Sequence, residues 1–167
     1  MDITLRGREP GDAAAYQRLY GHPAVYPWTL QLPFPSVATW EKKFAKMDAE
    51  GFINFIAEVE GKWWANSRCL PIIIRVPATA SVSVLASIPP SLVGESESIL
   101  IRNAMDYARN WLGITRMELE VFHDNHRALA LYERLGFERE GIRRQASLRE
   151  GKFHDVVMMA KLLTETA

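Results

Sequence analysis

The residues with the clearest chemical content lie between Asn125 and Phe137, in the string NHRALALYERLGF. Asn125 carries an amide that donates and accepts hydrogen bonds, and Tyr132 carries a phenol that can give a proton to a leaving group. A carboxylate that could accept a proton, Glu120, lies five residues before Asn125. Together these groups suit a reaction in which one atom loses a proton and another gains one.

A strand, a tight turn and a helix are expected to position these groups. The run Met117–Phe122 alternates apolar and charged side chains with a period of two, which indicates a strand. Asp124 or Asn125 can cap the helix that follows, and Gly136 can end it. Within this helix, apolar side chains recur at helical spacing at Ala128, Leu131 and Leu135. A βαβ-like unit of this kind builds a site at the end of its strand.

The spacing N-x-x-A-x-x-L-Y-x-x-x-G-F resembles the closing motif of the GNAT superfamily of acetyl-CoA-dependent N-acetyltransferases, and every fixed position of the motif is present. The resemblance implies acetyl-CoA as the cosubstrate and direct transfer of its acetyl group to an amine. It also implies that Asn125 hydrogen-bonds the pantetheine arm of the cosubstrate and that Tyr132 holds and protonates the leaving thiolate. Taken alone, Tyr132 could instead be an ordinary residue of an amphipathic helix.

Length and composition restrict the class of protein. The 167 residues suffice for a single domain, residues 1–167, and the 20 basic residues balance the 20 acidic ones. This balance gives no electrostatic basis for non-specific binding to nucleic acid or to a membrane. Without a leader or an apolar run that could span a bilayer, a cytoplasmic protein is expected. The one cysteine, Cys69, excludes an internal disulfide, and the four histidines lack ligand spacing, so no metal is expected.

The segment from His22 to Ser36 is rich in proline and aromatic residues. In the resembled family the loop at this position is a wall of the acceptor site, and the string V-Y-x-x-T-L-Q-x-P-x-P-S resembles its version in bacterial amino-acid and small-amine acetyltransferases. The resemblance therefore implies that Trp28, Leu30 and Gln31 contact the acceptor. An ordered loop packed on the core by Trp28 and Phe34 is the other interpretation, and the two are compatible.

The remaining periodicity predicts an α/β fold. Strands are expected over residues 2–8, 52–59, 117–122, 137–148 and 153–163, and helices over 13–20, 37–47, 99–112 and from 125 onward. In the helix over 99–112, Trp111 is expected on the apolar face. The resemblance implies the GNAT fold, a mixed central sheet of about seven strands with four helices, splayed between its fourth and fifth strands to admit the pantetheine arm. Dimers are usual among similar proteins, so a homodimer is an expectation of the resemblance alone.

Residues 63–98 depart from this resemblance. The family has here a third strand, a fourth strand and a pyrophosphate loop of the form Q/R-x-x-G-x-G/A. In this sequence the string at the loop, residues 92–98, is LVGESES. By position, the residues expected to contact the cosubstrate are Ser87, Val93, Gly94, Glu95 and Ser96. Glu95 and Glu97 would place negative charge where backbone N–H groups should bind phosphates.

One hypothesis accounts for the departure: residues from about Trp63 to Ser98 are written in a shifted reading frame. Tryptophan has a single codon, so the string K-W-W-A at residues 62–65, read one base earlier, gives V-V-G and completes the G-K-V-V-G turn usual in the family. The same offset permits S-F-G-I-G-V from residues 81–87 and H-P-S-F-T-G-R-G-I-G from residues 88–97. The alternative is a real, divergent segment, which would favour a non-catalytic binding protein with the GNAT fold.

The acceptor amine must lose a proton before it attacks a thioester, so a base is needed within reach. Glu120 is the expected base, because its position resembles that of the L-E-V glutamate proposed as base in ribosomal-protein alanine acetyltransferases. Strand alternation puts Glu118 on the same face, and either residue could be an ordinary exposed carboxylate; His123 is another candidate base. Asp155 lies in the string L-R-x-G-x-x-x-D-x-x-x-M-A, which resembles the end of the amino-acid acetyltransferases, and it either positions the amine or ends a hairpin.

The function expected from the sequence is acetyl transfer from acetyl-CoA to a primary amine of a small molecule, a free amino acid or similar amine. The alternative acceptor is the N-terminus of a peptide or ribosomal protein. A more open loop around residues 28–36 would favour that alternative.

Overall fold

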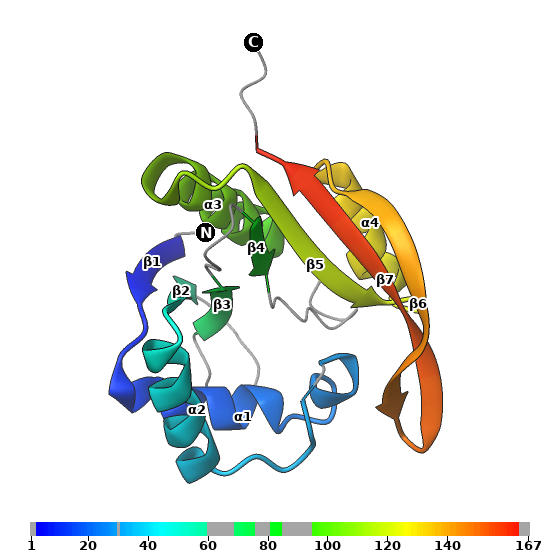
Figure 1. Ribbon diagram of the computed structural model, residues 1–167. Coiled ribbons are helices and arrows are strands. Elements are labelled where there is room, and N and C mark those ends of the chain that lie inside the picture. Colours follow the sequence, from blue (N-terminus) through cyan, green and yellow to red (C-terminus); the bar gives the residue numbers. More distant parts are fainter. Residues whose placement is uncertain (1–2, 30, 60–68, 76–80, 85–94, 164–167) are drawn as a thin grey trace.

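A computed structural model describes residues 3–29, 31–59, 69–75, 81–84 and 95–163. Its strands form one mixed sheet in the order β1-β2-β3-β4-β5-β7-β6 (Figure 1). The strands are β1 (Ile3–Gly7), β2 (Phe52–Val59), β3 (Cys69–Arg75), β4 (Ser81–Val84), β5 (Arg116–Phe122), β6 (Glu138–Arg149) and β7 (Lys152–Leu162). The helices are α1 (Ala13–Tyr20), α2 (Val37–Ala49), α3 (Glu95–Leu112) and α4 (His126–Arg134), with short 3-10 helices η1 (Pro10–Asp12) and η2 (Tyr26–Trp28). The predicted α/β class is confirmed.

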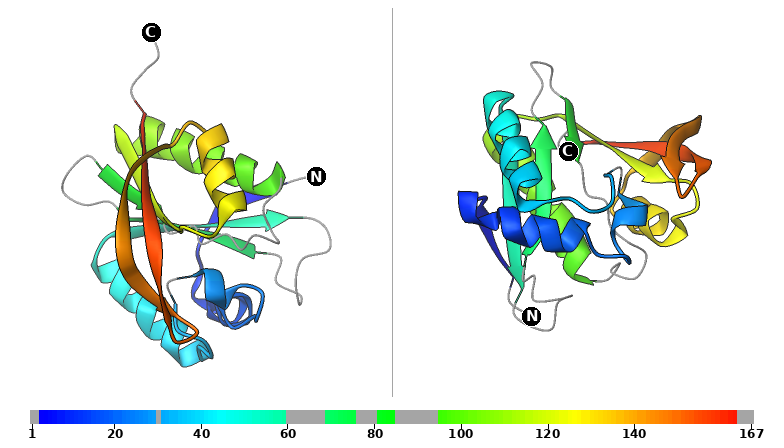
Figure 2. Two further views of the ribbon diagram at one scale, coloured as in Figure 1. Left: turned by 90° about the vertical axis from the view of Figure 1, so that its right-hand side faces the viewer. Right: turned by 90° about the horizontal axis from the view of Figure 1, so that it is seen from below.

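The sheet separates two hydrophobic cores, with α1 and α2 on one face and α3 and α4 on the other (Figure 2). On the first face, the rings of Tyr16, Trp40 and Phe44 pack together over Ile56 of β2. On the second face, alternate residues of β5 point toward α3 and α4; they are Met117, Leu119 and Val121. Because side chains of a strand alternate between faces, Glu118 and Glu120 lie on the opposite face of β5, as the sequence pattern predicts.

β4 and β5 are paired in parallel over the first residues of β5. Their pairing covers Ser81 to Ser83 of β4 and Arg116 to Glu118 of β5. The pairing of β5 with β7 continues further, to Phe122. The last residues of β5 are thus joined to the sheet along the β7 edge alone among the described strands. The expected splay between the fourth and fifth strands stays a prediction, because the residues that follow β4 lie outside the described ranges.

A Schellman motif ends α4. Gly136 adopts a left-handed backbone conformation with φ of 87° and donates its N–H to the carbonyl of Glu133 at 2.9 Å. Phe137 donates to the carbonyl of Tyr132 at 3.0 Å, and the two rings meet edge to face with centroids 5.7 Å apart. Lys161 of β7 donates from Nζ to the carbonyl of Leu135 at 2.6 Å. The predicted glycine stop is confirmed, and it ties Tyr132 to the strand that follows.

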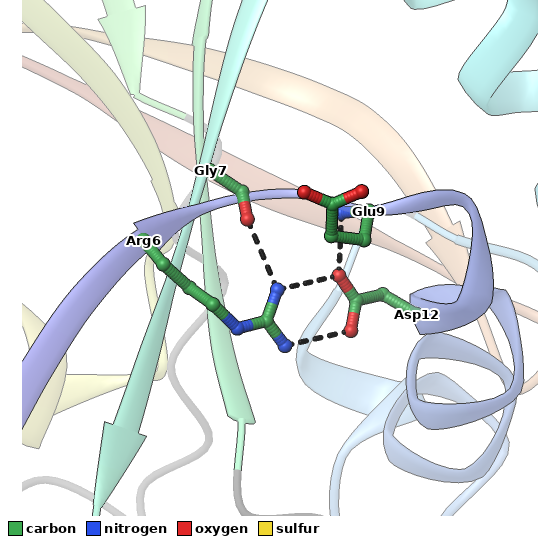
Figure 3. Close-up of polar contacts among 4 residues, drawn as sticks. All are labelled: Arg6, Gly7, Glu9 and Asp12. Carbon is green, nitrogen blue, oxygen red and sulfur yellow. Dashed lines mark hydrogen bonds and ion pairs between the residues drawn. The ribbon is translucent and has the colours of Figure 1, made fainter.

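Arg6 and Asp12 join β1 to the helices that follow it (Figure 3). Two guanidinium nitrogens of Arg6 donate to the two carboxylate oxygens of Asp12, each at 2.8 Å. The backbone N–H of Glu9 donates to the same carboxylate at 2.7 Å. The hydrogen bonds from Arg6 hold the pKa of Asp12 below its ordinary value, although burial opposes this. The contact therefore fixes α1, and with it the start of the segment 22–36, against the sheet.

The sequence prediction for α3 needs two corrections. The helix begins at Glu95, four residues before the predicted start at Ile99. Trp111 is 78% exposed and does not lie on the buried face. It follows the buried Ala108 by three residues, at the edge of that face, whereas Leu112 follows by four and packs on the core.

Candidate active site

Asn125 is the N-cap of α4 at the end of β5. Its Oδ1 accepts a hydrogen bond from the N–H of Ala128 at 3.2 Å, and its own N–H donates to the carbonyl of Phe122 at 2.9 Å. The side chain is buried, with 2% of the residue exposed. Of the two predicted caps, Asp124 and Asn125, the structure gives Asn125, and the cap lies beyond the residues of β5 that pair with β4.

Tyr132 is buried on the face of α4 that packs against the sheet. Only 1% of the residue is exposed, and burial raises the pKa of its phenol well above the ordinary value. A phenol with a raised pKa keeps its proton at neutral pH, as a proton donor must. Tyr132 is thus held in the protonation state that the role expected from the sequence requires.

Glu120 points toward β6. Its Oε1 accepts a hydrogen bond from Nη1 of Arg143 at 2.6 Å, across the intervening strand β7. Both side chains are substantially exposed, so the ion pair is solvated and contributes little to stability. Glu118, on the same face, lies 3.6 Å from Nη2 of Arg116. Each candidate carboxylate on this face therefore has an arginine beside it.

The segment that carries Trp28 is fixed by polar contacts along its length. Thr29 donates from Oγ1 to the carbonyl of Tyr26 at 3.0 Å and accepts from the N–H of Gln31 at 3.3 Å. Lys43 of α2 donates from Nζ to Oε1 of Gln31 at 2.5 Å. Ser36 caps α2 by accepting from the N–H of Thr39 at 3.0 Å, as predicted. The expected acceptor residue Leu30 lies outside the described residues.

Phe34 does not pack this segment on the core. The residue is 87% exposed and has a φ of 59°, which is unusual for a side chain other than glycine. Trp28 is instead the aromatic anchor, because its ring lies against the guanidinium of Arg149 at the end of β6, 4.7 Å from the ring centroid. The interpretation that both rings pack this segment on the core is wrong for Phe34, and the described contact of Trp28 is with Arg149 and not with either core.

Asp155 of β7 lies at an irregularity of β6. The register of the β6–β7 pair shifts between Arg143 and Ser147, and Gln145 in this interval has a φ of 50°. Oδ1 of Asp155 accepts from the N–H of Gln145 at 2.8 Å, and its backbone carbonyl accepts from the N–H of His123 at 3.0 Å. Asp155 therefore stabilises a β-bulge next to the end of β5, a position typical of functional sites.

The expected phosphate end of the site lies mostly outside the described residues, as do Ser87, Val93 and Gly94. Glu95 and Ser96 belong to the first turn of α3. In the same turn, Oγ of Ser98 accepts a hydrogen bond from Nη2 of Arg134 at 3.1 Å, which brings a cation of α4 to the start of α3. The hypothesis of a shifted reading frame concerns residues 63–98 and stays a prediction.

Two residues near the end of β5, Arg149 and His154, were not predicted as site residues from the sequence. Arg149 donates to both carboxylate oxygens of Asp124, and its Nη2 lies 3.1 Å from Nδ1 of His154. The string L-R-x-G already contains Arg149, but its contacts depend on residues far away in the sequence. Along the described ranges, the acidic, histidine and cysteine side chains form no group of three or more that could hold a metal ion.

Comparison with known proteins gives the family. The model of the Acetyltransferase (GNAT) family matches residues 98–137, which include most of α3 and all of β5 and α4. The chain is 30% identical over 166 residues to the L-amino acid N-acetyltransferase AaaT of Escherichia coli (strain K12), a match that covers 96% of this chain and 98% of that protein. The chain therefore belongs to the GNAT acetyltransferase family. It is an acetyl-CoA-dependent N-acetyltransferase.

Solved structures show the same fold. The spermidine N-acetyltransferase of Vibrio cholerae, solved in complex with CoA and spermine, has a TM-score of 0.82 and 24% identity, and the match covers 96% of this chain and 95% of that chain. The spermidine/spermine N-acetyltransferase SpeG of the same organism, solved with manganese ions, has a TM-score of 0.74 and 25% identity over 96% of this chain and 92% of that chain. None of the helices in the described ranges has both the length and the hydropathy needed to cross a membrane.

Proposed function

We propose that this protein transfers the acetyl group of acetyl-CoA to the primary amine of a free amino acid. The observation that carries the proposal is the match along nearly the whole chain to a relative that is an L-amino acid N-acetyltransferase. The proposal extends the shared family to a shared class of acceptor, and the contacts at the end of β5 support it.

Asn125 and Tyr132 fit the cosubstrate. Both are buried; Asn125 caps α4 and Tyr132 lies on it, and α4 follows the part of β5 that is not paired with β4. In our proposal Asn125 hydrogen-bonds the pantetheine arm. The phosphates lie at the first turn of α3, and the proposed contacts there are Ser87, Val93, Gly94, Glu95 and Ser96. Arg134, held by Ser98, adds a positive charge at this end. Acetyl-CoA supplies the activated thioester.

The chain's own residues would move two protons in the transfer. The amine loses a proton, for which Glu120 is the proposed acceptor, directly or through a water molecule. The amine nitrogen then bonds to the acetyl carbon and loses a further proton to solvent, and the carbon–sulfur bond breaks. Tyr132 gives its phenolic proton to the departing sulfur; burial raises the pKa of the phenol, so the phenol is protonated at neutral pH.

The charges near the end of β5 favour an amino acid over a polyamine. Carboxylates that could bind a second ammonium group already have partners: Glu120 pairs with Arg143, and Asp124 pairs with Arg149. Asp155 accepts from the backbone of Gln145. A polyamine would have to displace these partners, whereas a free amino acid carries its own carboxylate. In the proposed site Trp28, Leu30 and Gln31 line one side of the acceptor, with Asp155 supporting the other.

The test is a steady-state assay of CoA release from acetyl-CoA with three classes of acceptor: free L-amino acids, spermidine, and peptides with a free N-terminus. We expect the highest kcat/KM with a free amino acid. A higher value with the peptide or with spermidine would overturn the proposed acceptor class.

A further inference from the structure

A stacked arginine joins four segments of the chain at the end of β5. The guanidinium carbon of Arg149 lies 4.7 Å from the ring centroid of Trp28 and 4.7 Å from that of Phe122. Nη1 donates to Oδ1 of Asp124 at 3.3 Å, and Nη2 donates to Oδ2. Nδ1 of His154 lies 3.1 Å from Nη2. We call these five residues the Arg149 cluster.

The members of the Arg149 cluster come from the segments of the chain that surround the proposed active site. Trp28 belongs to η2 in the segment 22–36, and Phe122 is the last residue of β5. Asp124 directly precedes Asn125, the cap of α4. Arg149 and His154 lie on β6 and β7, on either side of the turn that joins them. The cluster therefore connects the proposed acceptor wall to the turn that carries Asn125.

The side chain of Arg149 is largely withdrawn from solvent, with 12% exposed. A guanidinium shielded in this way interacts more strongly with an aromatic face than one on an open surface. Burial opposes the ionisation of Asp124, but the hydrogen bonds and charge of Arg149 outweigh it and hold the pKa of Asp124 below its ordinary value. Because a guanidinium only donates, Nδ1 of His154 is the acceptor in their contact. The cluster is thus a hydrogen-bonded unit that contains an ion pair between Arg149 and Asp124.

We propose that Arg149 is a positioning residue for the acceptor: by clamping Trp28 against the end of β5, it sets the width of the amine subsite. This inference rests on the proposed function in that Trp28 lines that subsite. The guanidinium acts on the acceptor side through the indole ring, whereas toward the cosubstrate side it binds Asp124. It therefore affects acceptor binding and acceptor choice more than the use of acetyl-CoA.

The first test compares Arg149→Lys with the wild type. Lysine keeps the positive charge but has no planar guanidinium to stack between two rings and to bind both oxygens of Asp124. We expect the KM for the amine to rise about tenfold and the KM for acetyl-CoA to stay within about twofold. The matched control is Arg139→Lys on the same strand, where Nε donates to an exposed Glu133 at 2.7 Å. The control should change neither constant.

The second test is a double-mutant cycle with Trp28→Leu and Arg149→Met. If Arg149 acts through Trp28, the double variant has nearly the same KM for the amine as either single variant. Independent multiplication of the two effects would overturn the inference. An equal rise of both KM values in Arg149→Lys, or a loss of thermal stability with an unchanged KM for the amine, would show a merely structural role and would also overturn it.

A third measurement separates this inference from the proposed function. Acrylamide quenching of Trp28 fluorescence, obtained by difference from Trp28→Phe, needs no substrate. We expect Arg149→Met to make Trp28 more accessible. If the wild type prefers spermidine or a peptide, the proposed acceptor class fails, and the KM tests are run with the preferred amine. If quenching is unchanged, the clamp itself is refuted whichever amine is the substrate.

Discussion

At the scale of single residues, Tyr132 makes the sharpest prediction. Replacing it by phenylalanine keeps the ring and its contact with Phe137 but removes the proton. If the phenol protonates the leaving sulfur, Tyr132→Phe should lower kcat by about 10²- to 10⁴-fold, the usual contribution of a general acid. The KM for acetyl-CoA should change little. The measurement is kcat and KM at saturating amine.

Tyr20→Phe is the matched control for this variant. Tyr20 is also buried and burial also raises the pKa of its phenol, but it lies in the other hydrophobic core, beside Trp40. We expect Tyr20→Phe to leave kcat unchanged. A similar kcat in Tyr132→Phe and Tyr20→Phe would refute the proton-donor role.

Glu120 gives a second prediction at this scale, because its pairing with Arg143 leaves two interpretations. If Glu120 is the base, Glu120→Gln should be about 10²- to 10⁴-fold slower than the wild type in kcat. Glu118→Gln is the control on the same strand face, with its own arginine at 3.6 Å. Equal, near-normal rates in both variants would mean that Glu120 is only the partner of Arg143.

Residues differ in how far the sequence alone could place them. Asn125 was predicted as a cap because capping depends on neighbours three residues away, and the structure bears this out. Arg149 could not be found in this way, since its partners Trp28 and Asp124 lie far from it in the sequence. Phe34 was expected in the core, but a composition rich in aromatics does not say which ring turns inward.

At the scale of elements, the glycine that ends α4 gives a prediction about stability. Gly136→Ala puts a side chain on a left-handed residue, and the new Cβ would lie 3.1 Å from Nζ of Lys161. The control is Gly51→Ala at the end of α2, where φ is 74° and nothing lies within 4 Å. Both variants should lose about 1–2 kcal/mol from the backbone conformation. Gly136→Ala should lose about 1 kcal/mol more, because Lys161 would be pushed from the carbonyl of Leu135.

Denaturant unfolding measures this difference. Gly136→Ala should also slow catalysis, because the same motif fixes the carbonyl of Tyr132. Equal losses of stability in the two variants would show that Lys161 contributes nothing to the end of the helix.

The contact between β1 and η1 predicts a dependence of stability on pH. The pKa of Asp12 is lowered in the folded protein, so its ion pair with Arg6 stabilises the fold fully above the ordinary value of 3.8. As the pH falls through 3.8 toward the folded value, the unfolded chain takes up a proton first and this stabilisation is lost. Asp12→Asn should be less stable than the wild type at neutral pH. Between about pH 5 and pH 3, roughly one unit on either side of the ordinary pKa of 3.8, it should lose less stability than the wild type.

The measurement is the free energy of unfolding in urea at several pH values. Asp106→Asn is the control, since Asp106 forms an exposed pair with Arg109 at 3.7 Å. The same pH dependence in Asp12→Asn and in the wild type would contradict the assignment of this effect to Asp12.

Helices and strands could be predicted where the apolar residues recur with one clear period, either that of a strand or that of a helix. The alternation of β5 and the spacing of α4 each place one face on the core, and the structure agrees. The end of α3 was not predictable in the same way, because Trp111 sits at the edge of the buried face and Leu112 takes the core position instead. The bulge of β6 has no periodic signal, since it depends on Asp155 of another strand.

At the scale of the whole molecule, the sheet has two halves, which are joined by the pairing of β4 with β5. One half carries α1, α2 and the segment with Trp28, and the other carries α4 and the β6–β7 hairpin (Figures 1 and 2). The Arg149 cluster is a contact between the two halves on the side of the proposed acceptor. Arg134 and Ser98 join α4 to α3 on the side of the proposed phosphates. In the proposed site the acceptor and the cosubstrate would thus meet between two groups of elements, one fixed by the Arg149 cluster and the other by the hydrogen bond between Arg134 and Ser98.

The last prediction concerns the chain itself, because the proposed phosphate end depends on residues 63–98. A peptide mass map across Val59 to Arg102 distinguishes the printed residues from the shifted reading. We expect the shifted reading, since one offset supplies both the V-V-G turn and a glycine-rich loop in the places where the family has them. The protein should then bind acetyl-CoA tightly. Peptides that match the printed residues would refute the shift, and acetyl-CoA binding should then be weak, because Glu95 and Glu97 place negative charge in the first turn of α3, where its N–H groups would otherwise favour phosphate.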